Sequence, residues 1–164
     1  FEREGFRVEG AHEVAAGLTL APGPLGRHAP TPEQQADLDR AMETARALGR
    51  LDVGQGAVVC DGVVLAVEAQ EGTDAMLARV AGLPAALHGS PGALRGVLAK
   101  APKPIQELRM DMPVIGVRTV EGAAAAGLAG IAGEADAVLV LDREAVAARA
   151  DALGLFVYGV AAER

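Results

Sequence analysis

The sequence predicts an α/β fold with a mixed, partly parallel sheet, a β-hairpin and flanking helices. Three observations support this prediction. Short apolar strands alternate with helical segments through the last third of the chain, which is typical of parallel strands joined by helices. One strong hairpin signal adds an antiparallel pair. The 164 residues are 51% apolar, which is enough for the core of one ordinary domain.

The first thirty residues are interrupted by Pro22, Gly23, Pro24 and Pro30, which indicates a strand-like end piece followed by a linker. We therefore expect residues 31–164 to form the domain proper. Because the chain opens at Phe1 and not at a methionine, we also expect it to be cut from a longer protein.

Two signals at the start of the domain are local and strong. Thr31-Pro32-Glu33-Gln34 supplies an N-cap hydroxyl, a proline at the first helical position and a capping-box glutamine, so a helix is predicted up to Gly49. Two apolar strands are predicted at residues 56–60 and 63–68. They are separated only by Asp61-Gly62, which favours the positive φ angles of a type I′ turn.

The remaining elements follow from apolar runs and helix caps. Thr73 is predicted to cap a helix over residues 73–80, and residues 96–100 are predicted to form a strand. Further along the chain the predicted strands lie at 114–116, 130–132, 137–141 and 155–160, and the predicted helices at 119–126 and 142–153.

Composition excludes several classes of protein. The net charge is -7 and only 2% of the residues are aromatic, which argues against nucleic-acid binding by charge or by stacking. The apolar stretches are of strand length, far below the roughly 20 residues that span a bilayer. The single Cys60 excludes an internal disulfide, and we expect it to be a small buried apolar side chain.

The stretch from Arg95 to Arg109, which begins just before the predicted strand at residues 96–100, is basic. Both lysines of the chain, Lys100 and Lys103, lie in it with Arg95 and Arg109, against the single acid Glu107. Two prolines stiffen the segment, which lowers the ordering cost of binding an anion. The pattern predicts a phosphate site, and a solvated basic loop is the alternative reading.

Three carboxylates, Glu68, Glu71 and Asp74, surround Thr73 after the strand at residues 63–68. This is where open α/β sheets place their sites, and carboxylate oxygens suit a divalent cation. In the alternative reading, Asp74 only complements the helix dipole and Glu71 is solvated.

The stretch from Gln106 to Pro113 places Glu107, Arg109 and Asp111 on one side if it is extended. Arg109 and Asp111 then form a plain salt bridge, or the carboxylate ligates a cation and orients an attacking water.

Three segments in this order resemble the carboxyl-terminal domain of the LpxI family: residues 52–59, 64–76 and 103–116. The most specific string is Val67-Glu68-Ala69-Gln70-Glu71-Gly72-Thr73-Asp74-Ala75-Met76. The similarity continues through residues 119–132 and 139–159. Gly56 and Glu107 depart from it, standing where serine and aspartate are expected.

The resemblance implies a magnesium-dependent hydrolase of lipid A biosynthesis. Such an enzyme cleaves the pyrophosphate of UDP-2,3-diacylglucosamine to UMP and lipid X, the acylated sugar phosphate. Residues 1–30 would then be the tail of an absent nucleotide-binding domain plus a linker, and residues 31–164 the catalytic, lipid X-binding domain. The protein would be a cytoplasmic homodimer in transient peripheral contact with the inner membrane.

The resemblance places the essential aspartate of the family, in an Arg-x-Asp-x-Pro motif, on Asp111. Position in the chain and charge suggest two further groups of site residues, one for the substrate and one for Mg²⁺. The expected substrate-binding residues are Thr73, Lys100, Lys103, Gln106 and Arg109. The expected Mg²⁺ ligands are Asp111, Asp74 and Glu71. Two other functions stay open: a non-catalytic module that binds an acylated sugar phosphate, and an assembly or dimerisation domain.

Overall fold

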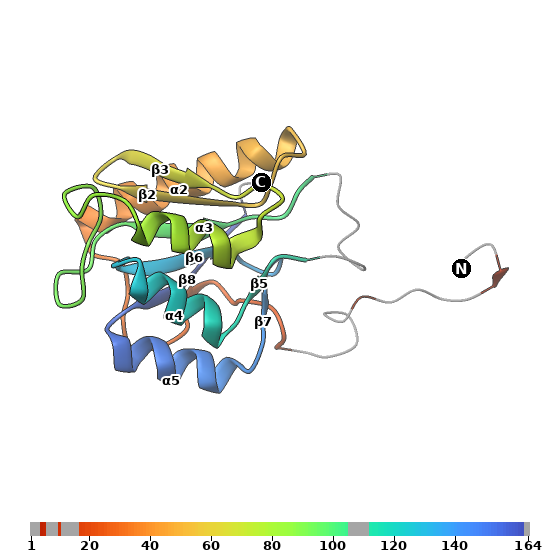
Figure 1. The fold of residues 1–164 in the computed structure, drawn as a ribbon. Coiled ribbons are helices and arrows are strands. Elements are labelled where there is room, and N and C mark those ends of the chain that lie inside the picture. Colours follow the sequence, from red (N-terminus) through yellow and green to blue (C-terminus); the bar gives the residue numbers. More distant parts are fainter. Residues whose placement is uncertain (1–3, 6–9, 11–16, 105–111, 163–164) are drawn as a thin grey trace.

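The computed structural model describes residues 4, 5, 10, 17–104 and 112–162, and within them a central six-stranded sheet (Figure 1). The strand order is β1-β8-β6-β4-β2-β3. The strands are β1 (Gly23–Pro24), β2 (Gly56–Cys60), β3 (Val63–Val67), β4 (Val97–Lys100), β6 (Gly130–Glu134) and β8 (Phe156–Val160).

The sheet is mixed, as the sequence predicts. β4, β6 and β8 run parallel, β2 is antiparallel to both β3 and β4, and β1 is antiparallel to β8. Since β3 and β4 are both antiparallel to β2, they run in the same direction. Their carboxyl ends therefore meet at one edge of the sheet.

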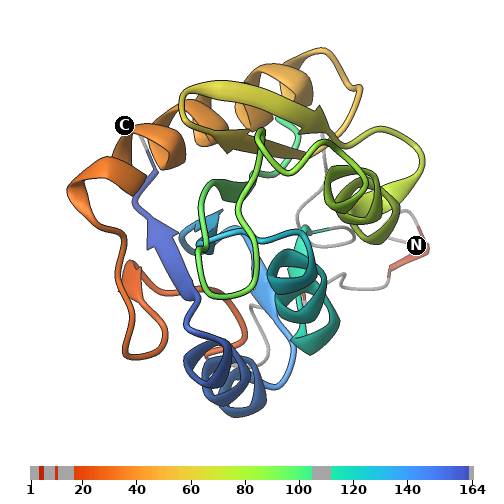
Figure 2. The ribbon, with the colours of Figure 1, turned by 60° about the vertical axis from the view of Figure 1, so that its left-hand side comes forward.

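Helices cover both faces of this sheet (Figures 1 and 2). α2 (Pro32–Arg50) packs on one face, where its apolar side joins a core cluster with alternate residues of β2 and β4. α3 (Gly72–Ala81), α4 (Val117–Ala125) and α5 (Arg143–Leu153) lie in a row on the other face and share a second core cluster with Val58, Leu98 and Ile131. Consecutive residues of a strand point to opposite faces, which explains how one sheet serves two cores.

The local signals of the first half are confirmed. The capping box of α2 forms, because Thr31 Oγ1 accepts from the Gln34 N–H and Gln34 Oε1 accepts from the Thr31 N–H. Asp61 and Gly62 adopt φ angles of 51° and 74°. The carboxylate of Asp37 in α2 accepts both backbone N–H groups of this turn, at 3.0 and 2.7 Å, which ties the helix to the hairpin.

Two predicted strands form a separate element. β5 (Val114–Ile115) and β7 (Leu139–Val140) pair in parallel as a two-stranded sheet beside the main one. β7 is shorter than the predicted strand at residues 137–141, because the chain is still turning at Asp136, where φ is 61°. α4 begins two residues before the predicted helix. Thr119 does not cap it, but lies in its first turn and accepts from the Gly116 N–H.

Residues 18–25, predicted as linker, pack against the domain. Leu20 is fully buried in the core beside α3, α4 and α5, and its N–H donates to the Val138 carbonyl at 2.8 Å. β1 then pairs with β8. These contacts are made by residues that lie within the predicted tail and linker, residues 1–30.

In the part of the chain that the structure describes, no helix combines the length and the apolar character needed to cross a membrane.

Candidate functional site

The polar residues of interest meet at the edge of the sheet where β3 and β4 end. Glu68 directly follows β3, Lys100 is the last residue of β4, and Thr73 lies in the first turn of α3. Thr73 was expected to cap α3, but the helix has no side-chain cap. The Thr73 hydroxyl instead contacts Glu68 and Lys100.

Lys100 is a buried cation, with only 4% of its surface exposed. Its Nζ donates to Thr73 Oγ1 at 2.7 Å and to the Val114 carbonyl of β5 at 3.1 Å. Burial lowers the pKa of Lys100, and the nearby carboxylates of Glu68 and Asp74 act in the opposite direction. Strand alternation explains its position: Val97 and Ala99 face α2, whereas Leu98 and Lys100 face α3 and α4.

Glu68 is also buried, at 5% exposure, and it was not assigned a role from the sequence. Its Oε1 accepts from the Thr73 hydroxyl at 3.0 Å. Its Oε2 is buried with no hydrogen-bond partner in the described part of the protein. Oε2 lies so close to Gly56 that a Cβ at that position would collide with it.

A cavity of about 580 Å³ opens in front of Lys100. Its polar wall contains Thr73, Asp74, Lys100, Arg118 and Thr119, and Leu141 lies at its apolar side. The first turn of α4, which begins at Val117, also lines the cavity. Backbone N–H groups at a helix start lack partners within the helix, so they can donate to a bound ligand. Two cations, the Thr119 hydroxyl and a helix N-terminus together suit a phosphate group.

The two described acids expected to hold Mg²⁺ are already engaged. Glu71 Oε1 accepts from Arg79 at 2.6 Å and its Oε2 accepts from the Ala69 N–H at 3.1 Å. Hydrogen bonds from its own backbone N–H and then from Arg79 lower the pKa of Glu71. Asp74 pairs with Arg118 at 2.6 Å. A metal ion bound at Glu71 or Asp74 would therefore compete with the arginine paired to that carboxylate.

The other residues expected at the site do not line the 580 Å³ cavity or lie outside the described residues. Lys103 pairs with Asp52 at 2.9 Å and lines a second, smaller hollow of about 160 Å³ beside Glu68 and Gly72. Arg95 precedes β4 and pairs with Asp61 of the hairpin turn at 2.6 Å, away from Lys100. Gln106, Arg109 and Asp111 lie outside the described residues.

Two residues that sequence reasoning missed complete the cavity. Arg118 and Thr119 belong to α4, and Arg118 escaped notice because the helix was predicted to start one residue after it. Glu68 was noted only as one of three acids. Its position directly after an apolar strand could have identified it, because a charged residue there is seldom buried without a partner.

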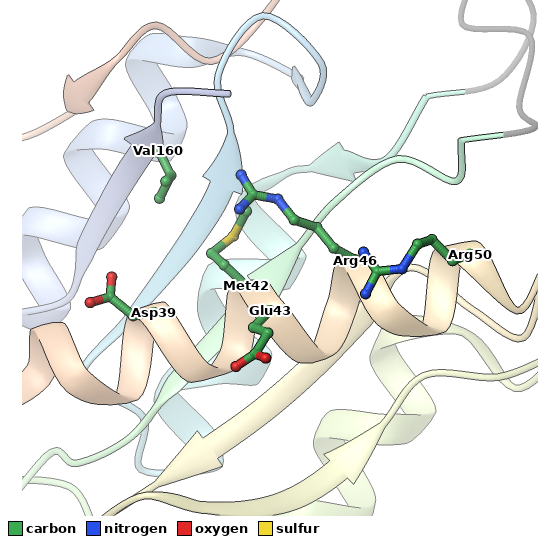
Figure 3. A pocket seen from close by; sticks show the side chains of 6 residues that line it. All are labelled: Asp39, Met42, Glu43, Arg46, Arg50 and Val160. Atoms are coloured by element: carbon green, nitrogen blue, oxygen red, sulfur yellow. The ribbon is translucent and has the colours of Figure 1, made fainter. Parts of the chain in front are cut away.

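One further cavity and one cluster of possible metal ligands are less suited to binding a phosphate or a metal ion. A cavity of about 260 Å³ lies over α2, and Figure 3 shows Asp39, Met42, Glu43, Arg46 and Arg50 of that helix with Val160 opposite. It combines acids with arginines, and Arg46 already pairs with Glu134 at 2.9 Å. A group of three possible metal ligands, Asp37, Cys60 and Asp61, is explained by folding, because Asp37 holds the hairpin turn.

Comparison with known proteins agrees with the resemblance noted in the sequence. A family model described as the LpxI C-terminal domain matches residues 21–158. A relative from Caulobacter vibrioides, named UDP-2,3-diacylglucosamine pyrophosphatase LpxI, is 66% identical over 160 residues. The match covers 98% of this chain but 57% of that relative, so the chain spans little more than half of its length. The chain belongs to the LpxI family, of which it matches the C-terminal domain.

Proposed function

We propose that the protein to which this chain belongs is a UDP-2,3-diacylglucosamine pyrophosphatase of lipid A biosynthesis. It hydrolyses the pyrophosphate to UMP and lipid X, and this domain binds the acylated sugar phosphate. The name of the 66% identical relative supports the reaction. The buried ammonium of Lys100 at the wall of the 580 Å³ cavity supports the assignment of the sugar phosphate to this domain.

The proposed contacts follow from the cavity wall. The phosphate accepts from Lys100, from Arg118 and from backbone N–H groups at the start of α4. Lys100 is held by Thr73 and Val114 before the substrate arrives, so it stabilises negative charge without having to reorganise, whereas Arg118 is shared with Asp74. Leu141, Val114 and Val117 give the cavity an apolar side that suits the first methylenes of an acyl chain.

Asp111 remains our proposed catalytic residue, as a metal ligand or as the acceptor of the water proton. Its place in the chain supports this, since it lies three residues before Val114, whose carbonyl accepts from Lys100. The role comes from the resemblance to the family.

Mg²⁺ dependence is also part of the proposal. When bound, a divalent cation neutralises charge on the pyrophosphate as water attacks. Asp111, Asp74 and Glu71 are the proposed ligands, and binding at the last two would compete with Arg118 and Arg79. Binding of Mg²⁺ by full-length protein, followed by calorimetry, tests this independently of turnover, and Asp111→Ala is expected to abolish the binding heat.

The reaction itself is tested with full-length protein and UDP-2,3-diacylglucosamine. We expect equal amounts of UMP and lipid X, and no UMP after EDTA treatment until Mg²⁺ is restored. Release of UDP, or of no nucleotide at all with correctly folded protein, would contradict the proposed reaction.

Two further parts of the proposal concern the cell. An amphiphilic, diacylated substrate favours transient contact with the inner membrane from the cytoplasmic side. We also propose that the full-length protein forms a homodimer. Vesicle co-sedimentation and analytical ultracentrifugation of full-length protein test these two proposals.

A further inference from the structure

The polar network behind the cavity extends to a residue that does not line it. Thr73 and Lys100 are in the cavity wall, whereas Glu68 lies behind them at 5% exposure. Glu68 contacts this wall through the Thr73 hydroxyl, at 3.0 Å. Because Glu68 is buried but does not line the cavity, direct contact with a ligand there does not explain its burial.

The directions of the hydrogen bonds in this network are fixed by chemistry. An ammonium group only donates, so Thr73 Oγ1 accepts from Lys100 at 2.7 Å. The hydroxyl has one proton, and a carboxylate only accepts, so that proton goes to Glu68 Oε1. Glu68 thereby orients the lone pair that receives the Lys100 ammonium.

The position of Glu68 is itself fixed by the backbone around it. Its N–H donates to the Gly56 carbonyl at 2.8 Å, which extends the hairpin ladder beyond β3. Gly54 and Gly56 allow close approach, because a Cβ at either position would collide with Glu68. The carboxylate is therefore held by the sheet.

Lys100 is left with one free donor. Thr73 Oγ1 and the Val114 carbonyl take two of its three N–H groups, and the third has no partner in the described part of the protein. Since Lys100 lines the cavity, this N–H is available to an anion there. A long side chain held in one rotamer before binding loses less entropy when the anion arrives.

We propose that Glu68 is a positioning residue, which acts through the Thr73 hydroxyl to hold Lys100 against the phosphate of the acylated sugar. This inference rests on the proposed function, and it adds a role for Glu68. Glu68 does not line the 580 Å³ cavity, so in this proposal its effect on the phosphate passes through Thr73 and Lys100.

The test measures lipid X affinity and UMP release with full-length protein. Thr73→Val keeps the shape of its side chain and removes the hydroxyl. Glu68→Gln keeps the shape but replaces an obligate acceptor with a neutral amide that also carries donors. Both are expected to weaken lipid X binding and kcat/KM at least about tenfold, the loss typical of one charge-assisted hydrogen bond. Thr73→Ser restores the hydroxyl and is expected to stay within about threefold of wild type.

Double variants separate positioning from a general effect on folding. If Glu68 acts only through Thr73 and Lys100, adding Glu68→Gln to Lys100→Met causes no further loss of affinity. A variant that merely loosens the fold weakens the Lys100→Met background as well. Glu121→Gln on the exposed side of α4 serves as the matched control and is expected to bind as wild type does.

Every outcome decides the proposal. Additive losses in the double variant, or no rescue by serine at position 73, overturn it while the proposed function stands. Failure of wild-type protein to bind lipid X or to release UMP overturns the proposed function, and the role of Glu68 with it. If Glu68→Gln does not fold, the pair Thr73→Val and Thr73→Ser still decides, because only the valine variant is expected to lose affinity.

Discussion

Among single residues, Lys100 is the hardest to explain by folding alone. Moving an ammonium out of water costs several kcal/mol, and buried ion pairs rarely repay that cost better than apolar residues of similar size. Lys100 ends an otherwise apolar strand, so a methionine there fits the core at least as well. Its burial beside a cavity therefore indicates a role in binding, since perturbed ionisable groups gather at functional sites.

Asp111 is the single residue whose removal we expect to reduce turnover most. In full-length protein we expect Asp111→Ala to reduce UMP release by at least about 10³-fold, because it removes a group that acts on the reacting atoms. Substrate affinity should stay within about threefold, since the cations of the cavity remain. Turnover at the wild-type rate removes Asp111 from the mechanism.

Cys60 offers a prediction that depends on pH. Burial, and then the nearby charge of Asp61, raise the pKa of the Cys60 thiol to about 11. The folded state therefore favours the protonated thiol. This stabilises the fold at pH below about 9, the ordinary value, and the contribution is lost as pH rises from there towards 11.

Thiol labelling checks this prediction in the 164-residue chain, where Cys60 is the only cysteine. At pH 8 the folded chain should react with a disulfide reagent at least about 100-fold more slowly than the chain in denaturant, because the thiolate is rare and buried. Equal rates in the two states would place Cys60 at the surface.

At the scale of elements, α5 shows how one residue fixes a helix start. Asp142 adopts a left-handed φ of 56°, and its Oδ1 accepts from the Ala145 N–H at 3.1 Å. Asparagine meets both requirements, but alanine neither caps the helix nor favours this φ. We expect Asp142→Ala to lower the free energy of unfolding by about 1–3 kcal/mol and Asp142→Asn by less than about 0.5 kcal/mol. Urea unfolding measures both, and equal values for the two variants would falsify the cap.

Most elements could be predicted because their signals are local. The capping box at Thr31, the turn at Asp61-Gly62 and the cap at Asp142 each involve residues within a few positions of one another. Thr73 shows the limit of this reasoning. It has the residue type and the place of a helix cap, yet its hydroxyl turns to a lysine 27 residues further along the chain. No local pattern reports a partner of that kind.

Part of the candidate site could also be predicted from local signals. The end of β3 and the lysine at the end of β4 were identified, because both strands were recognisable and carboxyl ends of strands favour sites. That β3 and β4 share an edge depends on the strand order, which places β2 between them. Arg95 and Lys100 are separated because Arg95 precedes β4 and Lys100 is its last residue, so the length of the strand lies between them.

For the whole molecule, the segment before β1 tests where the domain begins. Leu20 is fully buried between the sheet and the helices of one face, whereas Leu51, in the loop after α2, is 73% exposed. We expect Leu20→Ala to cost about 2–5 kcal/mol of unfolding free energy, because it leaves a cavity in the core. The matched change Leu51→Ala should cost less than about 0.5 kcal/mol. Similar values for both would mean that residues 18–25 contribute little to the fold.

The last prediction separates binding from turnover in this domain. The chain spans 57% of the Caulobacter relative, and its described cavity has donors for a phosphate but no aromatic ring to stack on uracil. We therefore expect the 164-residue chain to bind lipid X, to show no measurable affinity for UMP and to release no UMP from UDP-2,3-diacylglucosamine.

Calorimetry below the aggregation concentration of lipid X measures both affinities, and the Lys100→Met chain serves as control, with at least about tenfold weaker lipid X binding. Turnover by the chain alone would show that the reaction needs no second domain. Tight binding of UMP without lipid X would assign the cavity to the nucleotide half of the substrate, because the cations at Lys100 and Arg118 would then hold the other phosphate.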